Sequence, residues 1–172
     1  MGVKTYFWGP QAWLYIHTCS GLLDEKGNSE LGRRFWQMIQ NVIPCVNCRN
    51  SAEPTLQLLL TTHINNKKIA FLLHQEVNLK LFQQDIQKTH PDKSQLLSTV
   101  GKWAGYQPAF ENVQYTPPHS YQFWKATFNF LYYIICDFDA GDARLVYIPQ
   151  FFDITCEIFK NTEIGNAWAS TL

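Results

Sequence analysis

Hydrophobic residues recur along most of this chain at intervals of three or four residues, the spacing that places side chains on one face of an α-helix. In the first such stretch, Ala12, Ile16 and Leu23 tend to one side. Gly, Pro and polar residues separate the stretches. The pattern predicts helices over residues 10–23, 30–42, 45–60, 67–87, 94–103, 121–136 and 149–159. No stretch shows the strand–helix–strand alternation of a parallel sheet, and the sequence therefore predicts an all-α fold.

The lengths of the predicted loops divide the chain into two parts. Four of the helices within residues 1–104 are joined by short loops, which is typical of an antiparallel four-helix bundle. Residues 105–119 are rich in Pro, Gly, Gln and Asn, the composition of a linker. We therefore expect a domain over residues 1–104 and a helical extension over residues 105–172.

One spacing between a tryptophan and a cysteine in the extension matches a spacing in the first part. Trp124 precedes Cys156 by the same separation as Trp13 precedes Cys45, although no second close cysteine pair follows. The extension is therefore interpreted as either a degenerate repeat or an interface segment, and the matching separation alone is also compatible with coincidence.

Composition and charge exclude several classes of protein. The chain is 46% hydrophobic, and its 14 basic residues balance its 14 acidic residues. Without a basic stripe, we expect no electrostatic binding of nucleic acid. The longest strongly apolar stretch, residues 128–136, is too short to span a bilayer. The first residues lack the apolar segment of a signal peptide, so we expect a soluble, cytoplasmic protein without a membrane span.

The cysteine pair Cys45 and Cys48 carries the strongest chemical signal. Two residues separate the two thiols, and Pro44 precedes them at the predicted start of a helix. Such a pair closes a small disulfide ring, and the backbone N–H groups of a helix start stabilise a thiolate. We expect Arg49, the next residue, to add to this stabilisation. A pair of this kind in a cytoplasmic chain suggests catalysis or metal binding before a structural disulfide.

Two further pairs have helical spacing. Trp13 and His17 share one helix face, and His74 and Asn78 share another. Together with the dithiol, an indole, two imidazoles and an amide could line a site for a flat aromatic cofactor. Candidates for binding a phosphate group are Lys80 and Lys102.

These elements, in this order, form a familiar pattern. Trp8-Gly9-Pro10-x-x-Trp13-x-x-x-His17, Ile43-Pro44-Cys45-x-x-Cys48 and His74-Gln75-Glu76-Val77-Asn78-x-x-Leu81 resemble the Erv/ALR family of FAD-dependent sulfhydryl oxidases. The resemblance covers about residues 7–81. The compact chain looks most like the versions carried by large cytoplasmic DNA viruses, which implies the host cytoplasm or the virion as its location.

The resemblance implies a function and assigns roles to residues. It implies a thiol oxidase that forms disulfides in partner proteins and reduces O₂ to hydrogen peroxide, with FAD as cofactor. Cys48 would lie against the flavin, and Cys45 would exchange with the substrate. The residues implied to contact FAD are Gly9, Trp13, His17, His74, Val77, Asn78 and Lys80. A homodimer and a dithiol partner, such as a thioredoxin-like or C-x-x-C relay protein, are implied as well.

Three other interpretations remain open. A zinc site would need two more ligands, such as His63 and His74. A thioredoxin-like oxidoreductase would need βαβ units. A helical interaction module without oxidase activity would use an aromatic surface, composed of Phe123, Trp124, Phe128, Phe130, Leu131 and Tyr132.

The remaining cysteines and histidines are expected to have no chemical role. Cys19, Cys136 and Cys156 lie in apolar helices and are expected to be small buried side chains. Three histidines in polar or loop contexts are expected to face solvent, namely His63, His90 and His119.

Overall fold

The computed structural model describes residues 4–62, 64–89, 120–163, 165, 166 and 170, and it is all-α over these residues. The elements are α1 (Thr5–Lys26), α2 (Ser29–Val42), α3 (Val46–Thr61), α4 (Asn66–Thr89), α6 (Ser120–Asp137), the 3₁₀ helix η2 (Ala143–Val146) and α7 (Tyr147–Phe159). No strand occurs in the described ranges. The predicted all-α class is confirmed. The helix predicted over residues 94–103 and the linker predicted over residues 105–119 lie outside the described residues.

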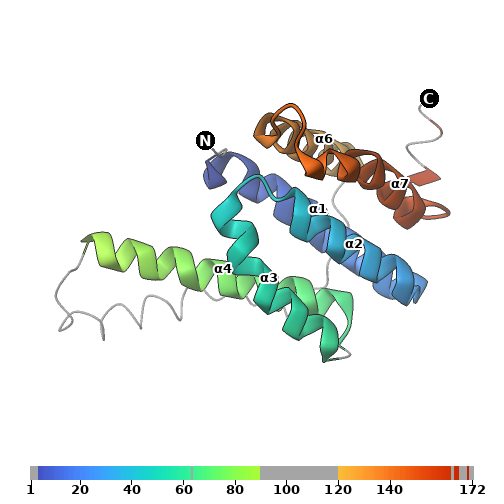
Figure 1. Cartoon of the computed structure of the whole chain (residues 1–172). Helices are drawn as coiled ribbons and strands as arrows, with labels where there is room; N and C mark the ends of the chain where they lie inside the picture. Colours follow the sequence, from blue (N-terminus) through green and yellow to red (C-terminus); the bar gives the residue numbers. More distant parts are fainter. Residues whose placement is uncertain (1–3, 63, 90–119, 164, 167–169, 171–172) are drawn as a thin grey trace.

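The helices form three layers, with α1 and α2 in the middle (Figure 1). On one side α4 packs against α1, and α3 packs against α2 and α4. On the other side α6 packs against α1, and α7 packs against both α2 and α1. The antiparallel arrangement of a four-helix bundle stays a prediction.

The central helix α1 begins earlier than its sequence pattern predicts. We predict Pro10 in the first turn, because proline lacks the N–H that a helix interior requires. Instead α1 begins at Thr5, and Pro10 lies inside it. The preceding turn buries Trp8 and Gly9, and Trp8 lies beside Phe130 of α6. A proline inside a helix disfavours the helical turn before it. In α1 that turn nevertheless forms, and its Trp8 packs against α6.

The connection between α1 and α2 follows local chemistry that the sequence predicts. Gly27 ends α1 with φ of 64°, a left-handed conformation that glycine adopts without steric cost, and its N–H donates to the Leu23 carbonyl. Asn28 then caps α2 by accepting a hydrogen bond from the Leu31 N–H at 3.0 Å. Gly27 and Asn28 thus produce the break predicted at this point.

The start of α4 is held by a side chain of α1. The Asp24 carboxylate accepts hydrogen bonds from the backbone N–H groups of Asn66 and Lys67, at 2.8 and 2.9 Å, and from the Asn66 amide. These backbone groups have no partner within their own helix. The Asn66 side-chain oxygen Oδ1 in turn accepts from the Trp36 indole N–H of α2 at 2.9 Å. One polar network thereby fixes α4 relative to α1 and α2.

One hydrophobic core includes residues from both sides of the middle layer. Tyr15 of α1 is fully buried, and its ring stacks on Phe151 of α7 with 4.9 Å between centroids. Its hydroxyl shares a 2.6 Å hydrogen bond with the Thr155 hydroxyl. Residues of α6 and α7 therefore complete the core around α1. The predicted division between residues 104 and 105 falls outside the described residues.

Candidate functional site

The cysteine pair lies where the sequence predicts it, at the start of α3, and forms a disulfide. Cys45 is the N-cap residue, and its sulfur accepts a hydrogen bond from the Cys48 N–H at 3.2 Å. Both cysteines are half-buried. Backbone N–H groups at a helix start favour negative charge, so this position suits a thiolate after reduction.

The disulfide forms part of the wall of a cavity of about 290 Å³ between α1, α3 and α4. The rest of the wall is largely apolar and aromatic, and includes Trp8, Trp13 and Val77. Pockets for small ligands typically occupy about 300–1,000 Å³. This cavity is therefore of the size of a ring system rather than of a whole dinucleotide.

Three rings next to this cavity connect α1 to α4. The Trp13 indole stacks on the His74 imidazole, with 3.9 Å between centroids and 10° between planes. The His17 Nε2 and His74 Nδ1 atoms share a hydrogen bond at 2.9 Å. One imidazole N–H must donate to an unprotonated nitrogen of the other, so this bond requires that at least one ring be neutral.

Burial keeps both imidazoles neutral at ordinary pH. It lowers the pKa of His17 from 6.5 to about 4. Burial, with repulsion from His17 as a second cause, also lowers the pKa of His74 to about 4. The pair therefore acts as a hydrogen-bonded aromatic support for Trp13, without positive charge.

The cavity includes some of the predicted cofactor residues and omits others. Gly9, Trp13, Val77 and Lys80 line it together with the two cysteines. His17 and His74 lie behind Trp13, outside the cavity wall. Asn78 is half-buried and is not part of the wall.

The Lys80 ammonium already interacts with neighbouring groups, which disfavours it as a phosphate-binding cation. Its ammonium lies 3.2 Å from the Glu76 carboxylate, one helical turn away, and 3.4 Å from the Ser51 carbonyl oxygen of α3. Any anion at this site would compete with both groups. Lys102, the other candidate, lies outside the described residues.

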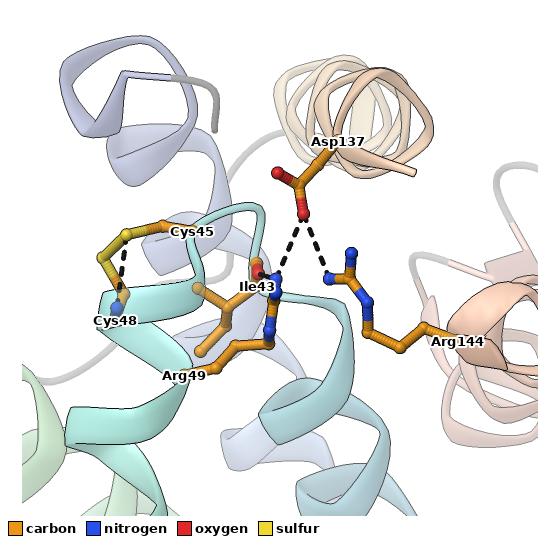
Figure 2. The surroundings of a disulfide bond; sticks show 6 residues. All are labelled: Ile43, Cys45, Cys48, Arg49, Asp137 and Arg144. Carbon is orange, nitrogen blue, oxygen red and sulfur yellow. Dashed lines mark hydrogen bonds and ion pairs between the residues drawn. A yellow bond between two sulfur atoms is a disulfide. The ribbon is translucent and has the colours of Figure 1, made fainter. Parts of the chain in front are cut away.

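Arg49 does not face the disulfide as we expected. Its guanidinium donates to the Ile43 carbonyl oxygen at 2.5 Å and lies 3.1 Å from the Asp137 carboxylate. Figure 2 shows this group pointing toward Asp137, on the side of α3 away from the two sulfur atoms. The Arg49 guanidinium, which we predicted would stabilise the thiolate, is therefore paired with a carboxylate of α6 instead.

The other cysteines are only partly as predicted. Cys19 is fully buried, and burial raises the pKa of its thiol well above the usual range. Cys136 and Cys156 are exposed rather than buried. All three are free thiols. The three histidines expected to face solvent, His63, His90 and His119, lie outside the described residues.

The structure also bears on the alternatives to a redox site. Within the described residues, no group of three or more His, Cys, Asp or Glu side chains could hold a metal ion. The predicted aromatic surface for an interaction module is wrong in part, since Phe123, Phe130 and Leu131 are not on the surface but buried in the core. Phe128 and Tyr132 are exposed, and a larger cavity of about 650 Å³ lies between α6 and α7.

Several cavity residues were missed by sequence reasoning. Trp8, Ala12 and Ile16 line the wall from α1, and their four-residue spacing was a signal for one shared face. Glu76 lines it from α4, and its spacing to Lys80 predicts their ion pair. Asp137, which binds Arg49, offered no local signal because it lies far along the chain.

Comparisons of this chain with models of known protein families, with curated proteins and with solved structures find no match. Of the helices in the described part of the chain, none combines the length and the hydropathy needed to cross a bilayer.

Proposed function

We propose that this protein is an FAD-dependent thiol oxidase that forms disulfides in partner proteins. One observation carries the proposal: the Cys45–Cys48 disulfide is part of the wall of a cavity that is also lined by Trp8 and Trp13. A dithiol pair in contact with a site for a flat ring is the arrangement that electron transfer from thiols to a flavin requires.

The composition of the cavity wall fits the flavin ring system. Aromatic faces and aliphatic side chains suit a planar, largely apolar ring, and the disulfide supplies the reacting sulfur atoms. At about 290 Å³ the cavity does not enclose a whole FAD molecule. The adenine and phosphate parts would therefore lie outside this cavity, along the protein surface.

In the first half of the proposed cycle, the cysteine pair oxidises a substrate dithiol. A substrate thiolate attacks the Cys45 sulfur, the Cys45–Cys48 bond breaks, and Cys48 leaves as a thiolate. A second substrate thiolate then attacks the mixed disulfide and releases Cys45. The substrate becomes a disulfide, and the cysteine pair gains its two electrons.

The assignment of Cys45 as the outer and Cys48 as the inner cysteine rests on the resemblance to Erv/ALR oxidases. Both cysteines lie at the helix start, whose N–H groups favour a thiolate, and the Cys48 N–H donates to the Cys45 sulfur. Bound FAD would accept two electrons from the reduced pair and pass them to O₂, giving hydrogen peroxide.

Trp13, His17 and His74 have a supporting role in this proposal. Trp13 presents its indole to the cavity, and the neutral His17–His74 pair holds that indole from behind. A stacked, hydrogen-bonded support limits rotation of the indole and so keeps the cavity open for a ring. A homodimer and a thioredoxin-like or C-x-x-C substrate protein also belong to the proposal, through the same resemblance.

The proposal is tested with the purified full-length protein. We expect flavin absorption bands that persist after desalting, and oxygen consumption when dithiothreitol is supplied as a dithiol. Cys48→Ser should abolish oxygen consumption and keep the flavin, whereas the control Cys156→Ser should leave both unchanged, because Cys156 is an exposed thiol of α7 that is not part of the wall around Cys45 and Cys48. A colourless protein that takes up no added FAD, or full turnover by Cys48→Ser, would contradict the proposal.

A further inference from the structure

The residue that follows the cysteine pair is bound to the C-terminal helices. Arg49 lies in the first turn of α3, and its Nη1 atom is 3.1 Å from the Oδ2 atom of Asp137, the last residue of α6. The exposed fractions of these two side chains are only 16% and 8%. Because solvent is largely excluded, this pair interacts more strongly than an exposed surface ion pair.

A second arginine completes a neutral cluster. The Arg144 Nη1 atom lies 3.0 Å from the same Asp137 oxygen, and its Nη2 atom lies 2.7 Å from the Asp142 carboxylate. Two guanidinium groups and two carboxylates therefore share one site, with no net charge. Figure 2 shows Asp137 between the two arginines.

Arg49 also holds the turn that leads into the cysteine pair. The Ile43 carbonyl oxygen accepts one hydrogen bond from the Arg49 guanidinium and another from the Cys45 N–H at 2.8 Å. The position of Arg49 thus affects both the backbone before Cys45 and the charge near the sulfur atoms.

Few other charges face the disulfide. From α4, the side chains of Glu76 and Lys80 line the same cavity and are paired with each other at 3.2 Å. The described residues of α1 that line the cavity are uncharged. Lys80 is thus already neutralised by Glu76, and Arg49 is the cation that directly follows the cysteine pair in the chain.

We propose that Asp137 is a positioning residue that holds the Arg49 guanidinium away from the Cys45–Cys48 sulfur atoms and so limits thiolate stabilisation in the reduced pair. This inference rests on the proposed redox role of the pair. It gives the C-terminal helices a function at the site, because α6 supplies the carboxylate. Through this carboxylate, the C-terminal helices influence the equilibrium between the disulfide and the dithiol.

Two substitutions separate this role from a purely structural one. Asp137→Asn leaves the cluster with one surplus positive charge and frees Arg49 to approach the sulfur atoms. Arg49→Met leaves one surplus negative charge and removes the cation. Both break the Arg49–Asp137 ion pair, so a purely structural role predicts shifts of the same sign, whereas the positioning role predicts shifts of opposite sign.

The first measurement is the rate of iodoacetamide alkylation of the reduced full-length protein between pH 5 and 10, read at Cys45 and Cys48 by mass spectrometry. We expect the pKa of the more reactive thiol to fall by about one unit in Asp137→Asn, which is roughly a tenfold change in thiolate fraction. In Arg49→Met we expect the pKa to rise.

The second measurement is the equilibrium with glutathione. Two glutathione molecules reduce the Cys45–Cys48 disulfide to a dithiol and become one oxidised glutathione, so two electrons and two protons are transferred. A more stable thiolate shifts this equilibrium toward the dithiol. We expect a several-fold shift toward the dithiol in Asp137→Asn and a shift toward the disulfide in Arg49→Met.

Shifts of the same sign in both variants, or no shift in either, would overturn the inference. If Asp137→Asn does not fold, as judged by circular dichroism, Arg49→Met alone decides through the direction of its pKa change. Neither measurement involves flavin or oxygen. A wild-type protein that binds no FAD would therefore refute the proposed oxidase function and leave the result on Asp137 standing.

Discussion

The neutral pair of His17 and His74 predicts how the stability of this protein depends on pH. Burial lowers the pKa of both imidazoles from 6.5 to about 4, so the unfolded chain binds protons more strongly than the folded protein between these values. The full stability of the fold is present above about pH 6.5 and is lost progressively as pH falls toward 4. Protonation of both rings would also remove the acceptor of their shared hydrogen bond.

The size of this effect follows from the two pKa values. At pH 5 each imidazole would cost about 2 kcal/mol relative to pH 8, at roughly 1.4 kcal/mol per pKa unit. The rings are half-buried, and the first proton would be shared between them, so solvent screening and coupling reduce the sum. We therefore expect about 2 kcal/mol for the pair rather than about 4 kcal/mol.

Urea unfolding at pH 5 and pH 8 measures this contribution. The comparison is between the wild type and a double variant, His17→Gln with His74→Gln, in which both side chains stay neutral at either pH. The other histidines and the carboxylates are the same in both proteins and cancel in the difference. Both proteins must carry the same amount of any bound ligand, because a bound ligand adds its own stabilisation.

The free energy of unfolding of the wild type should fall between pH 8 and pH 5 by about 2 kcal/mol more than that of the double variant. An equal fall in the two proteins would refute the reasoning, since it would show that the imidazoles keep an ordinary pKa in the folded state.

Three further predictions concern the fold and the free thiols. Asp24→Ala removes the carboxylate that caps α4, and the free energy of unfolding should fall by about 2–3 kcal/mol in urea titrations; an unchanged value would contradict this capping role. Tyr15→Phe removes one buried hydrogen bond between α1 and α7 and keeps the ring packing, so we expect a loss of only about 1 kcal/mol; a loss several times larger would mean that the hydroxyl holds more than this contact. Maleimide should modify Cys136 and Cys156 in the folded protein and Cys19 only after unfolding, as read by mass spectrometry; early modification of Cys19 would show that its burial is wrong.

Local sequence patterns predicted most of the helices because the signals are themselves local. Gly27 and Asn28 mark the boundary between α1 and α2 through backbone conformation and capping, which involve only neighbouring residues. The same holds for Cys45 at the start of α3. Pro10 misled the prediction, because its usual preference for the first turn is outweighed by contacts with α6 that no short window contains.

The candidate site was predictable only as separate pieces. Helical spacing placed Trp13 beside His17, but the stacking of Trp13 on His74 depends on how α1 packs against α4. Arg49 and Asp137 are 88 residues apart in sequence, so their pairing depends on the whole fold. A cation next to a cysteine pair in sequence therefore cannot be assumed to stabilise a thiolate, because a carboxylate far along the chain can bind it instead.

The helix that carries the disulfide is also among the least anchored. Only Ala52 and Leu56 of α3 are buried, whereas α1 buries side chains toward both neighbouring layers. Opening of a protein segment requires less free energy where fewer apolar contacts must be broken. In hydrogen exchange, the amides of α3 should thus exchange through local fluctuations while those of α1 exchange only when the whole molecule unfolds. The cysteine pair consequently lies on a helix with few buried side chains, next to a middle layer that buries many.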